Sequence, residues 1–255
     1  MISADMVSTD LGVQVIKNPQ MEICVQKWSN MYKNTASWNN GRIISLSLAS
    51  AISREFSRLV LAETEITADG DRYISEQFKK LSSKLSVAIE QACAMGGIIV
   101  KPYLSNGNIF IDLIRADCFL PVAFTEKTMT AAVFVSKKTV GNVYFTLLEY
   151  HEFNAENQTH TIKNKVCKSL NSEYIGMECS FDEVPEWSGL VSEITFRNVE
   201  NRCFRISECL MQTILTLIHR SEFQSMRGLL TLSVRLMNSG RELSGNTNQR
   251  KPLLM

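Results

Sequence analysis

Several patterns that would mark an enzyme are missing from this 255-residue chain, which has only three histidines. His151-Glu152 and His160 do not fit H-E-x-x-H, in which the second histidine follows one helical turn after the first, and this segment alternates like a strand. No Gly-rich loop followed by Lys and Ser or Thr is present, and Gly96-Gly97 fits a helix end better than a nucleotide-binding loop. The histidines, cysteines and serines form no nucleophile–base pattern. We therefore expect no enzyme activity and assign no catalytic, cofactor-binding or metal-ligating residue.

The seven cysteines include no C-x-x-C pair, which argues against a disulfide framework and against a zinc site. A reduced, cytosolic setting is predicted. The first residues contain acids and no basic-then-apolar segment, and no apolar run reaches the roughly 18 residues of a membrane span. We therefore expect neither a secretory leader nor a membrane partner.

Charge changes sign along the chain, although the net charge is only +1. The part before Arg202 has 19 Lys and Arg against 23 acids, and the part from Arg202 onward has eight against three. In the first part the basic residues are interleaved with acids, so the basic surface that nucleic-acid binding requires is not predicted there.

Helical spacing predicts three helices in the first hundred residues. The first covers about 19–33, with Ile23, the Lys27 stem, Trp28, Met31 and Tyr32 on its apolar side. Trp28 and Tyr32 in this helix, and Trp38 in the following loop, are candidate residues for a subunit interface or the core. The second helix, within 45–66, has the apolar stripe Leu48, Ile52, Phe56, Leu59 and Val60. The third follows an Asp-Gly-Asp turn and stops at Gly96-Gly97.

After Gly97 the apolar period falls to two, which is typical of strands. Asn106-Gly107 between "IIVKPYL" and "NIFIDLI" predicts a hairpin. An antiparallel meander is predicted through "TAAVFVSKK", "VYFTLLEYHEF" and "THTIKNKVCK", with "VPEWSGL" as a loop and "EITFRNV" as a last strand. The predicted class is α+β, with a helical part over 1–96, a β-rich part over 97–201 and a separate tail over 202–255.

Five segments in this order resemble the N-terminal part of tailed-bacteriophage portal proteins, the head–tail connectors. They are "KWSNMYKNTASW", "LASAISREFSRLVLAETEI", "EQACAMGGIIVKPYL", "IFIDLIRADCFLPVAF" and "EVPEWSGLVSEITFRNVEN". The resemblance covers about 21–201. It implies a phage or prophage structural protein, a minor capsid component of the virion that is not an enzyme.

The resemblance also implies partners. Such proteins form a homo-oligomeric ring at one capsid vertex, through which DNA is packaged and later ejected. The ring contacts capsid, scaffolding and packaging-motor proteins and then the tail. Double-stranded DNA passes without sequence-specific contacts. An acidic body fits this role, because each phosphate that a basic residue neutralises adds affinity, and tight binding would stall the DNA. The expected location is the portal vertex of the virion, and the host cytoplasm during assembly.

The tail over 202–255 departs from the family and has an unusual composition. It contains no Asp, Trp or Tyr, while Leu, Arg and Ser make up 23 of its 54 residues, about 43% against roughly 30% for random sense codons. Shifting the reading frame by one base yields portal-like sequence, with Ala fixed by Met211-Gln212 and Glu by Met237-Asn238. We predict an out-of-frame tail, poorly ordered or weakly helical, on a truncated portal chain that forms no working connector.

A different interpretation takes the tail as genuine. The segment from "ISECLMQTIL" to "SVRLM" would then be a basic amphipathic helix for a membrane surface or a partner. The chain would be a cytoplasmic module that binds nucleic acid or another protein. Salt-dependent DNA binding by residues 1–201 would favour this alternative.

Overall fold

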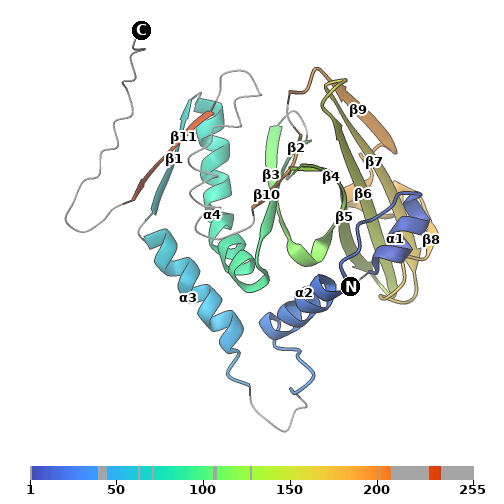
Figure 1. The fold of residues 1–255 in the computed structure, drawn as a ribbon, viewed down its shortest axis with the longest axis horizontal. Helices are drawn as coiled ribbons and strands as arrows, with labels where there is room; N and C mark the ends of the chain where they lie inside the picture. The colour runs from blue at the N-terminus through green and yellow to red at the C-terminus, as the bar shows by residue number, and fades with distance from the viewer. Residues whose placement is uncertain are drawn as a thin grey trace, which may run out of the picture.

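The computed structural model describes residues 2–39, 45–62, 64–70, 72–105, 108–126, 128–200, 202–207 and 230–236. Helices and antiparallel sheets are both present in this region, which confirms the predicted α+β class (Figure 1). All three predicted helices are present, and a short N-terminal one was not predicted. The helices are α1 (Ala4–Leu11), α2 (Pro19–Tyr32), α3 (Leu48–Ala62) and α4 (Arg72–Met95).

Local capping explains where these helices begin and end. The Asn18 side chain accepts a hydrogen bond from the Met21 N–H at 3.1 Å, and Pro19 occupies the first turn of α2. Gly96 ends α4 with φ of 85°, as predicted from the sequence. The unpredicted α1 is capped by the Ser3 hydroxyl, which accepts from the Met6 N–H. Its eight residues make only two turns, too few for a clear apolar period.

The predicted meander strands and the predicted last strand form four strands of a six-stranded antiparallel sheet, to which β4 and β8, not predicted from the sequence, are added. The order is β4-β5-β6-β7-β8, and β9 pairs with the same edge of β7 as β8 does, further along. The predicted "VPEWSGL" loop contains a short 3-10 turn, η3 (Pro185–Trp187). The strands are β4 (Phe119–Thr125), β5 (Thr128–Val140), β6 (Val143–Asn154), β7 (Thr159–Ser169), β8 (Met177–Glu178) and β9 (Glu193–Arg197); two further 3-10 turns are η1 (Ala116–Cys118) and η2 (Phe181–Glu183).

Two smaller sheets complete the described fold. The predicted hairpin forms the pair β2 and β3, whose Asn106-Gly107 turn lies outside the described residues, and β10 adds to the free edge of β2. A separate pair joins β1 to β11, two segments far apart in the sequence. The strands are β1 (Thr64–Gly70), β2 (Ile98–Ser105), β3 (Asn108–Arg115), β10 (Arg205–Ser207) and β11 (Leu230–Leu236).

The strands β10 and β11 lie in the predicted tail over 202–255. We predicted a tail that is poorly ordered or weakly helical; where the structure describes this tail it is extended, so no weak helix is found in those residues. Phe204 is buried against Ile99, Phe134 and neighbours, which places residues 202–207 on the body, past the predicted boundary at 201. The physical reason is that β2 and β1 offer unpaired backbone groups along their edges, and an extended segment satisfies them.

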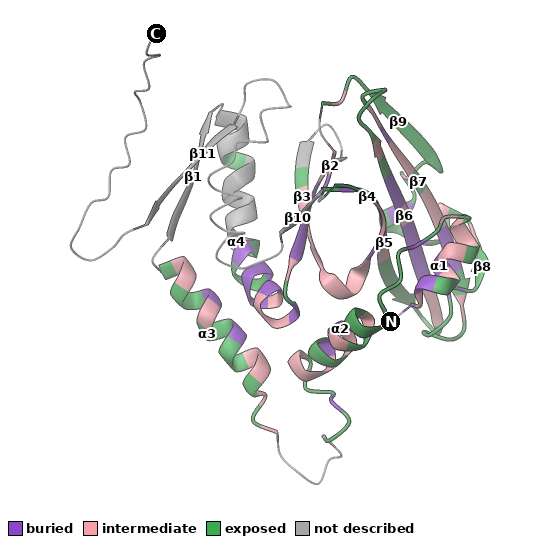
Figure 2. Ribbon diagram, viewed as in Figure 1, coloured by how far each residue is buried: buried purple, intermediate pink, exposed green. Residues whose placement is uncertain are grey.

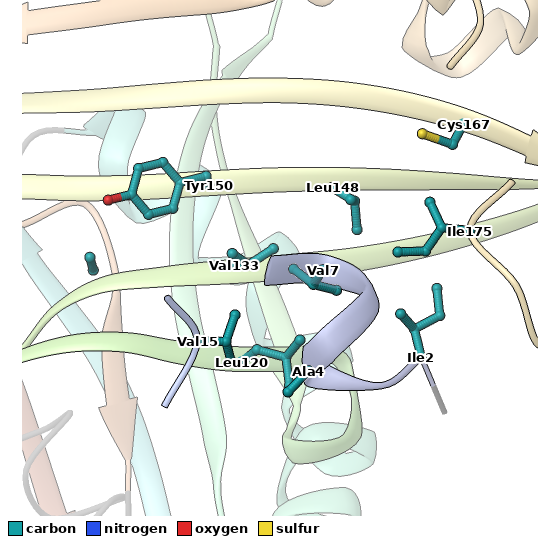
Figure 3. Packing of buried hydrophobic residues seen from close by; sticks show 11 residues of the cluster. Ile2, Ala4, Val7, Val15, Leu120, Val133, Leu148, Tyr150, Cys167 and Ile175 are labelled. Carbon is teal, nitrogen blue, oxygen red and sulfur yellow. The ribbon is translucent and has the colours of Figure 1, made fainter. Parts of the chain in front are cut away.

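Each face of the six-stranded sheet is covered by a different part of the chain. Helix α1 and the residues beside it lie on one face, where Val7, Leu148 and Val133 are almost fully buried (Figure 3). The other face packs against β2, Phe204 and the loop that carries Val184. The consecutive buried residues within β5 and β6, purple in Figure 2, are therefore covered from both sides.

Gly176 is the glycine whose replacement we expect to be least tolerated. Its φ is 86°, and a Cβ there would lie 2.0 Å from the backbone oxygen of Lys168 on β7. We expect Gly176→Ala to lower the free energy of unfolding by about 2 kcal/mol or more, through the positive φ and the clash together. Gly141→Ala is the control, because its φ of 60° is similar but nothing lies within 4 Å of the added Cβ. Urea denaturation showing equal losses for both variants would contradict this expectation.

Candidate functional site

The three aromatic residues singled out in the sequence do not form one patch. Trp28 lies beside Gly96 at the end of α4, and its side chain is at the border of exposed. Tyr32 donates its hydroxyl to Glu90 Oε1 on α4 at 2.9 Å. Trp38 lies in the turn after α2 and is exposed. Trp28 and Tyr32 therefore hold α2 against α4, and only Trp38 stands apart from that contact.

Helix α3 packs on the molecule with small polar residues instead of its apolar stripe. Ser53 and Ser57 are its buried residues, and the Ser57 hydroxyl donates to the backbone oxygen of Ser86 on α4 at 2.7 Å. Hydroxyl groups that bond to a neighbouring backbone allow two helices to approach closely. The face of α3 toward α4 is therefore a serine face.

The predicted stripe of α3 lies largely on the outside. Leu48, Ile52 and Leu59 are 60%, 64% and 48% exposed, while Phe56 and Val60 are half-buried. We call the three exposed residues the α3 stripe. Their spacing places them within about 40° of one another around the helix. The sequence identified this apolar face, and the structure places most of it outside, because α3 contacts α4 through the serines.

Helix α2 shows the same inversion at its start. Ile23, which we assigned to the apolar side, is 68% exposed, and the buried residues of α2 are Val25 and Ser29. The Ser29 hydroxyl donates to Asp117 Oδ2 at 2.9 Å. Both helices thus use polar groups in their attachment and leave some large apolar side chains exposed.

Asp117, just after β3, is the point where α2 is fixed to the sheet. Besides Ser29 it receives Lys33 Nζ at 3.2 Å and Arg115 Nε at 2.8 Å. Burial raises the pKa of this carboxyl, but the hydrogen bond from Ser29 and the charges of Arg115 and Lys33 outweigh it and lower the pKa to about 2. Asp117 is therefore ionised throughout the neutral range.

A cavity of about 650 Å³ lies beside Asp117. Its wall carries five basic side chains, and within the described part of the chain each has an oxygen partner. The pairs are Lys33 and Arg115 with Asp117, Lys101 with Glu149, Lys137 with the Ser172 carbonyl and Lys138 with Glu186. Because these cations are already paired, we do not assign an anion site to the cavity.

A chain of buried ionisable groups crosses from β2 to β7. Lys101 Nζ lies 2.6 Å from Glu149 Oε1, and the same oxygen lies 2.5 Å from His151 Nε2. His151 Nδ1 is 2.9 Å from His160 Nε2, and His160 Nδ1 is 3.5 Å from the Cys203 backbone nitrogen. Both histidines are almost completely buried. We call Lys101, Glu149, His151 and His160 the buried chain.

The hydrogen bonds of the buried chain fix one direction of donation. Glu149 is an acceptor only, so His151 carries its proton on Nε2. The neutral His151 ring then accepts at Nδ1, and His160 must donate from Nε2. This leaves His160 Nδ1 as the acceptor for the Cys203 N–H. Each ring nitrogen is used once, so neither ring accepts a further proton without losing a hydrogen bond.

The pKa values of the buried chain follow from burial and these contacts. Burial lowers the pKa of His151, against the opposing effect of the Glu149 carboxylate. Burial, and then the neighbouring His151, lower the pKa of His160 to about 3. For Glu149, burial raises the pKa, but the His151 hydrogen bond and the Lys101 charge bring it down to about 2. At neutral pH the chain therefore holds one ion pair and two neutral rings.

The buried chain is a cross-link between the β2 sheet and the six-stranded sheet, and we did not predict it from the sequence. The sequence does contain an indication of it. Lys101 and Glu149 are charged residues in apolar strands, and each lies on the same side of its strand as a buried residue two positions earlier, Ile99 and Leu147. A charge in such a position requires a partner. Which strand supplies that partner depends on the packing of the two sheets.

The described residues show neither a cluster of metal ligands nor a helix suited to crossing a membrane. No group of three or more His, Cys, Asp or Glu in this part of the chain is arranged to hold a metal ion. No described helix has the length and apolar character to cross a membrane. The sequence matches no protein-family model, and it matches no curated protein.

Proposed function

We propose that the body of this chain, up to about residue 201, is a subunit of the portal type that assembles head to tail into a ring. The main support for assembly is the α3 stripe, whose apolar side chains are exposed to water in the single chain. The order of the five portal-like segments supports the type of ring. The helix-then-sheet architecture is compatible with it.

The cost of exposing the α3 stripe is the physical argument for a partner surface. Burying a leucine or isoleucine side chain contributes about 1.5–3 kcal/mol of favourable free energy. Covering the three side chains of the α3 stripe with a partner would therefore stabilise a complex substantially. Charged residues border the stripe, with Arg54, Glu55 and Arg58 exposed on the same helix. An apolar centre with a polar rim is the usual composition of a subunit interface.

The position of α3 is compatible with a contact that repeats between neighbouring subunits of a ring. In Figure 1, α3 lies on the opposite side of the described structure from β6, β7 and β9. A ring requires two different surfaces on each subunit, because each copy contacts one neighbour on each side. The α3 stripe would supply one of these surfaces. DNA within such a ring would pass an acidic body, and capsid, scaffolding and packaging-motor proteins would be the external partners.

The proposal predicts self-association that depends on the α3 stripe. We expect the purified chain to sediment as concentration-dependent oligomers larger than a dimer, and the variant Leu48→Ser/Ile52→Ser/Leu59→Ser to lose these larger oligomers while its melting temperature changes little. The three side chains make few internal contacts, so their loss affects the contact between copies and not the fold.

Leu170→Ser/Met177→Ser is the matched control for this experiment. Both residues are highly exposed, at 81% and 79%, but lie around β8, away from α3. This control should associate like the parent chain. A parent chain that stays monomeric at every concentration, or a stripe variant that associates like the parent, would contradict the proposed assembly.

A further inference from the structure

Strand β9 presents an open edge of the six-stranded sheet. All five of its residues, Glu193–Arg197, are exposed, and among the described residues β9 pairs only with β7. In Figure 1 it lies at the border of the large sheet. An uncovered edge of this kind presents unpaired N–H and C=O groups to any other extended segment.

The pairing with β7 determines which backbone groups face outward. The Asn164 N–H donates to the Ser192 carbonyl at 2.8 Å, and inward and outward groups alternate along an antiparallel strand. Ile194 and Phe196 therefore direct their backbone groups toward β7. Glu193, Thr195 and Arg197 direct theirs away from the sheet.

The sequence of this edge is complementary to itself. If a second β9 lies antiparallel to the first with Thr195 opposite Thr195, Glu193 lies opposite Arg197 at both ends. The three facing pairs are then formed by the residues whose N–H and C=O groups point outward, so the backbone hydrogen bonds and the opposite charges require the same register. On the other face of the strand, Ile194 lies opposite Phe196.

The charges at the two ends of β9 are available for this contact. Among the described residues neither Glu193 nor Arg197 forms an ion pair. Ile194 and Phe196, each 39% exposed, would gain cover from the partner strand. We propose that β9 binds β9 of a second copy of this chain, forming a two-fold antiparallel strand pair that joins two large sheets.

This contact is separate from the proposed ring contact. A two-fold pair closes at two copies, whereas a ring contact repeats from one subunit to the next. The β9 contact comprises one five-residue strand from each copy. We therefore expect a weak dimer, with a dissociation constant on the order of tens of micromolar.

Reversing the charge at either end of β9 tests this pairing. Glu193→Arg places arginine opposite arginine at both ends, and Arg197→Glu places glutamate opposite glutamate. Each variant alone should self-associate about tenfold or more weakly than the parent chain. An equimolar mixture of the two restores opposite charges at both ends and should form a heterodimer. Sedimentation velocity, with one variant labelled by a fluorophore, measures both effects.

Two controls separate this contact from others. Glu156→Arg makes the same charge change in the exposed turn between β6 and β7 and should leave the dimer unchanged. The whole series is repeated in the α3 stripe variant, so failure of the ring proposal does not affect the result. Absence of a dimer in that background, undiminished association of either single variant, or no heterodimer on mixing would each overturn the β9 pairing.

Discussion

Glu149→Gln is expected to lower the free energy of unfolding by about 3 kcal/mol. The change keeps the volume of the side chain and an oxygen that accepts from His151, but it leaves the Lys101 ammonium buried without its 2.6 Å partner. Breaking a buried ion pair from one side costs about 3–5 kcal/mol. We expect the lower end of this range, because Asp112 lies opposite Lys101 on β3. Urea denaturation measures the loss.

A second ion pair in the same molecule provides the control. Lys138 Nζ and Glu186 Oε1 also lie 2.6 Å apart, but both side chains are exposed. Glu186→Gln should cause no measurable loss, because water replaces the missing charge. Lys101→Met/Glu149→Gln should be more stable than Glu149→Gln alone, since it removes the unpaired ammonium. Equal losses for Glu149→Gln and Glu186→Gln would show that the buried chain is not the cross-link described.

Lowering the pH is expected to destabilise the fold already at pH values well above those at which carboxylates become protonated. His160 has its pKa lowered from 6.5 to about 3, so below pH 6.5 the unfolded chain binds a proton that the folded chain does not. The free energy of unfolding then falls by about 1.4 kcal/mol per pH unit from this residue. His151, whose pKa is also lowered, acts in the same direction.

The size of the acid effect follows from that slope. By pH 4.5, the ordinary pKa of a glutamate, His160 alone should have removed about 3 kcal/mol. Below this pH, protonation of Glu149 adds a further loss, which continues toward its folded pKa of about 2. His160→Gln keeps a donor and an acceptor but cannot titrate, so its stability should fall less steeply with pH between pH 6.5 and 4.5 than that of the parent chain. A flat curve for the parent chain would contradict the neutral, buried histidine pair.

Which segments form helices and strands was largely evident from the sequence, because the signals are local. Asn18 before Pro19 and Gly96 after α4 act through neighbouring backbone groups, and period-two alternation predicted β5, β6 and β7. Helix α1 escaped prediction because two turns give no clear period. The pairing of β1 with β11 depends on segments far apart in the chain, for which no local signal exists.

The direction in which each helix face points could not be predicted in the same way. The sequence shows that Leu48, Ile52 and Leu59 share a face, but only the packing against α4 shows that Ser57 lies inside and the leucines outside. The buried chain has a similar origin. Lys101 and Glu149 are 48 residues apart, and their contact requires the β2 sheet to pack on β6.

The segment after Asn201 has the composition of an unselected tail, yet part of it packs on the body. Its composition and the displaced frame predict a tail that was never selected for a structure, whereas Phe204 is buried and β10 pairs with β2. The two are compatible, because three backbone pairs on an open edge and one aromatic side chain in an apolar pocket require little sequence information.

The nucleotide sequence across the codons for Val199 to Phe204, and downstream of them, tests the proposed portal body most directly. We expect the frame displaced by one base to stay open and to continue with portal-like sequence, with Ala at Met211-Gln212 and Glu at Met237-Asn238. A displaced frame that is soon closed by stop codons would contradict it. The residues from 202 onward would then be genuine, and the alternative of a basic amphipathic helix for a membrane surface or a partner would be the one to test.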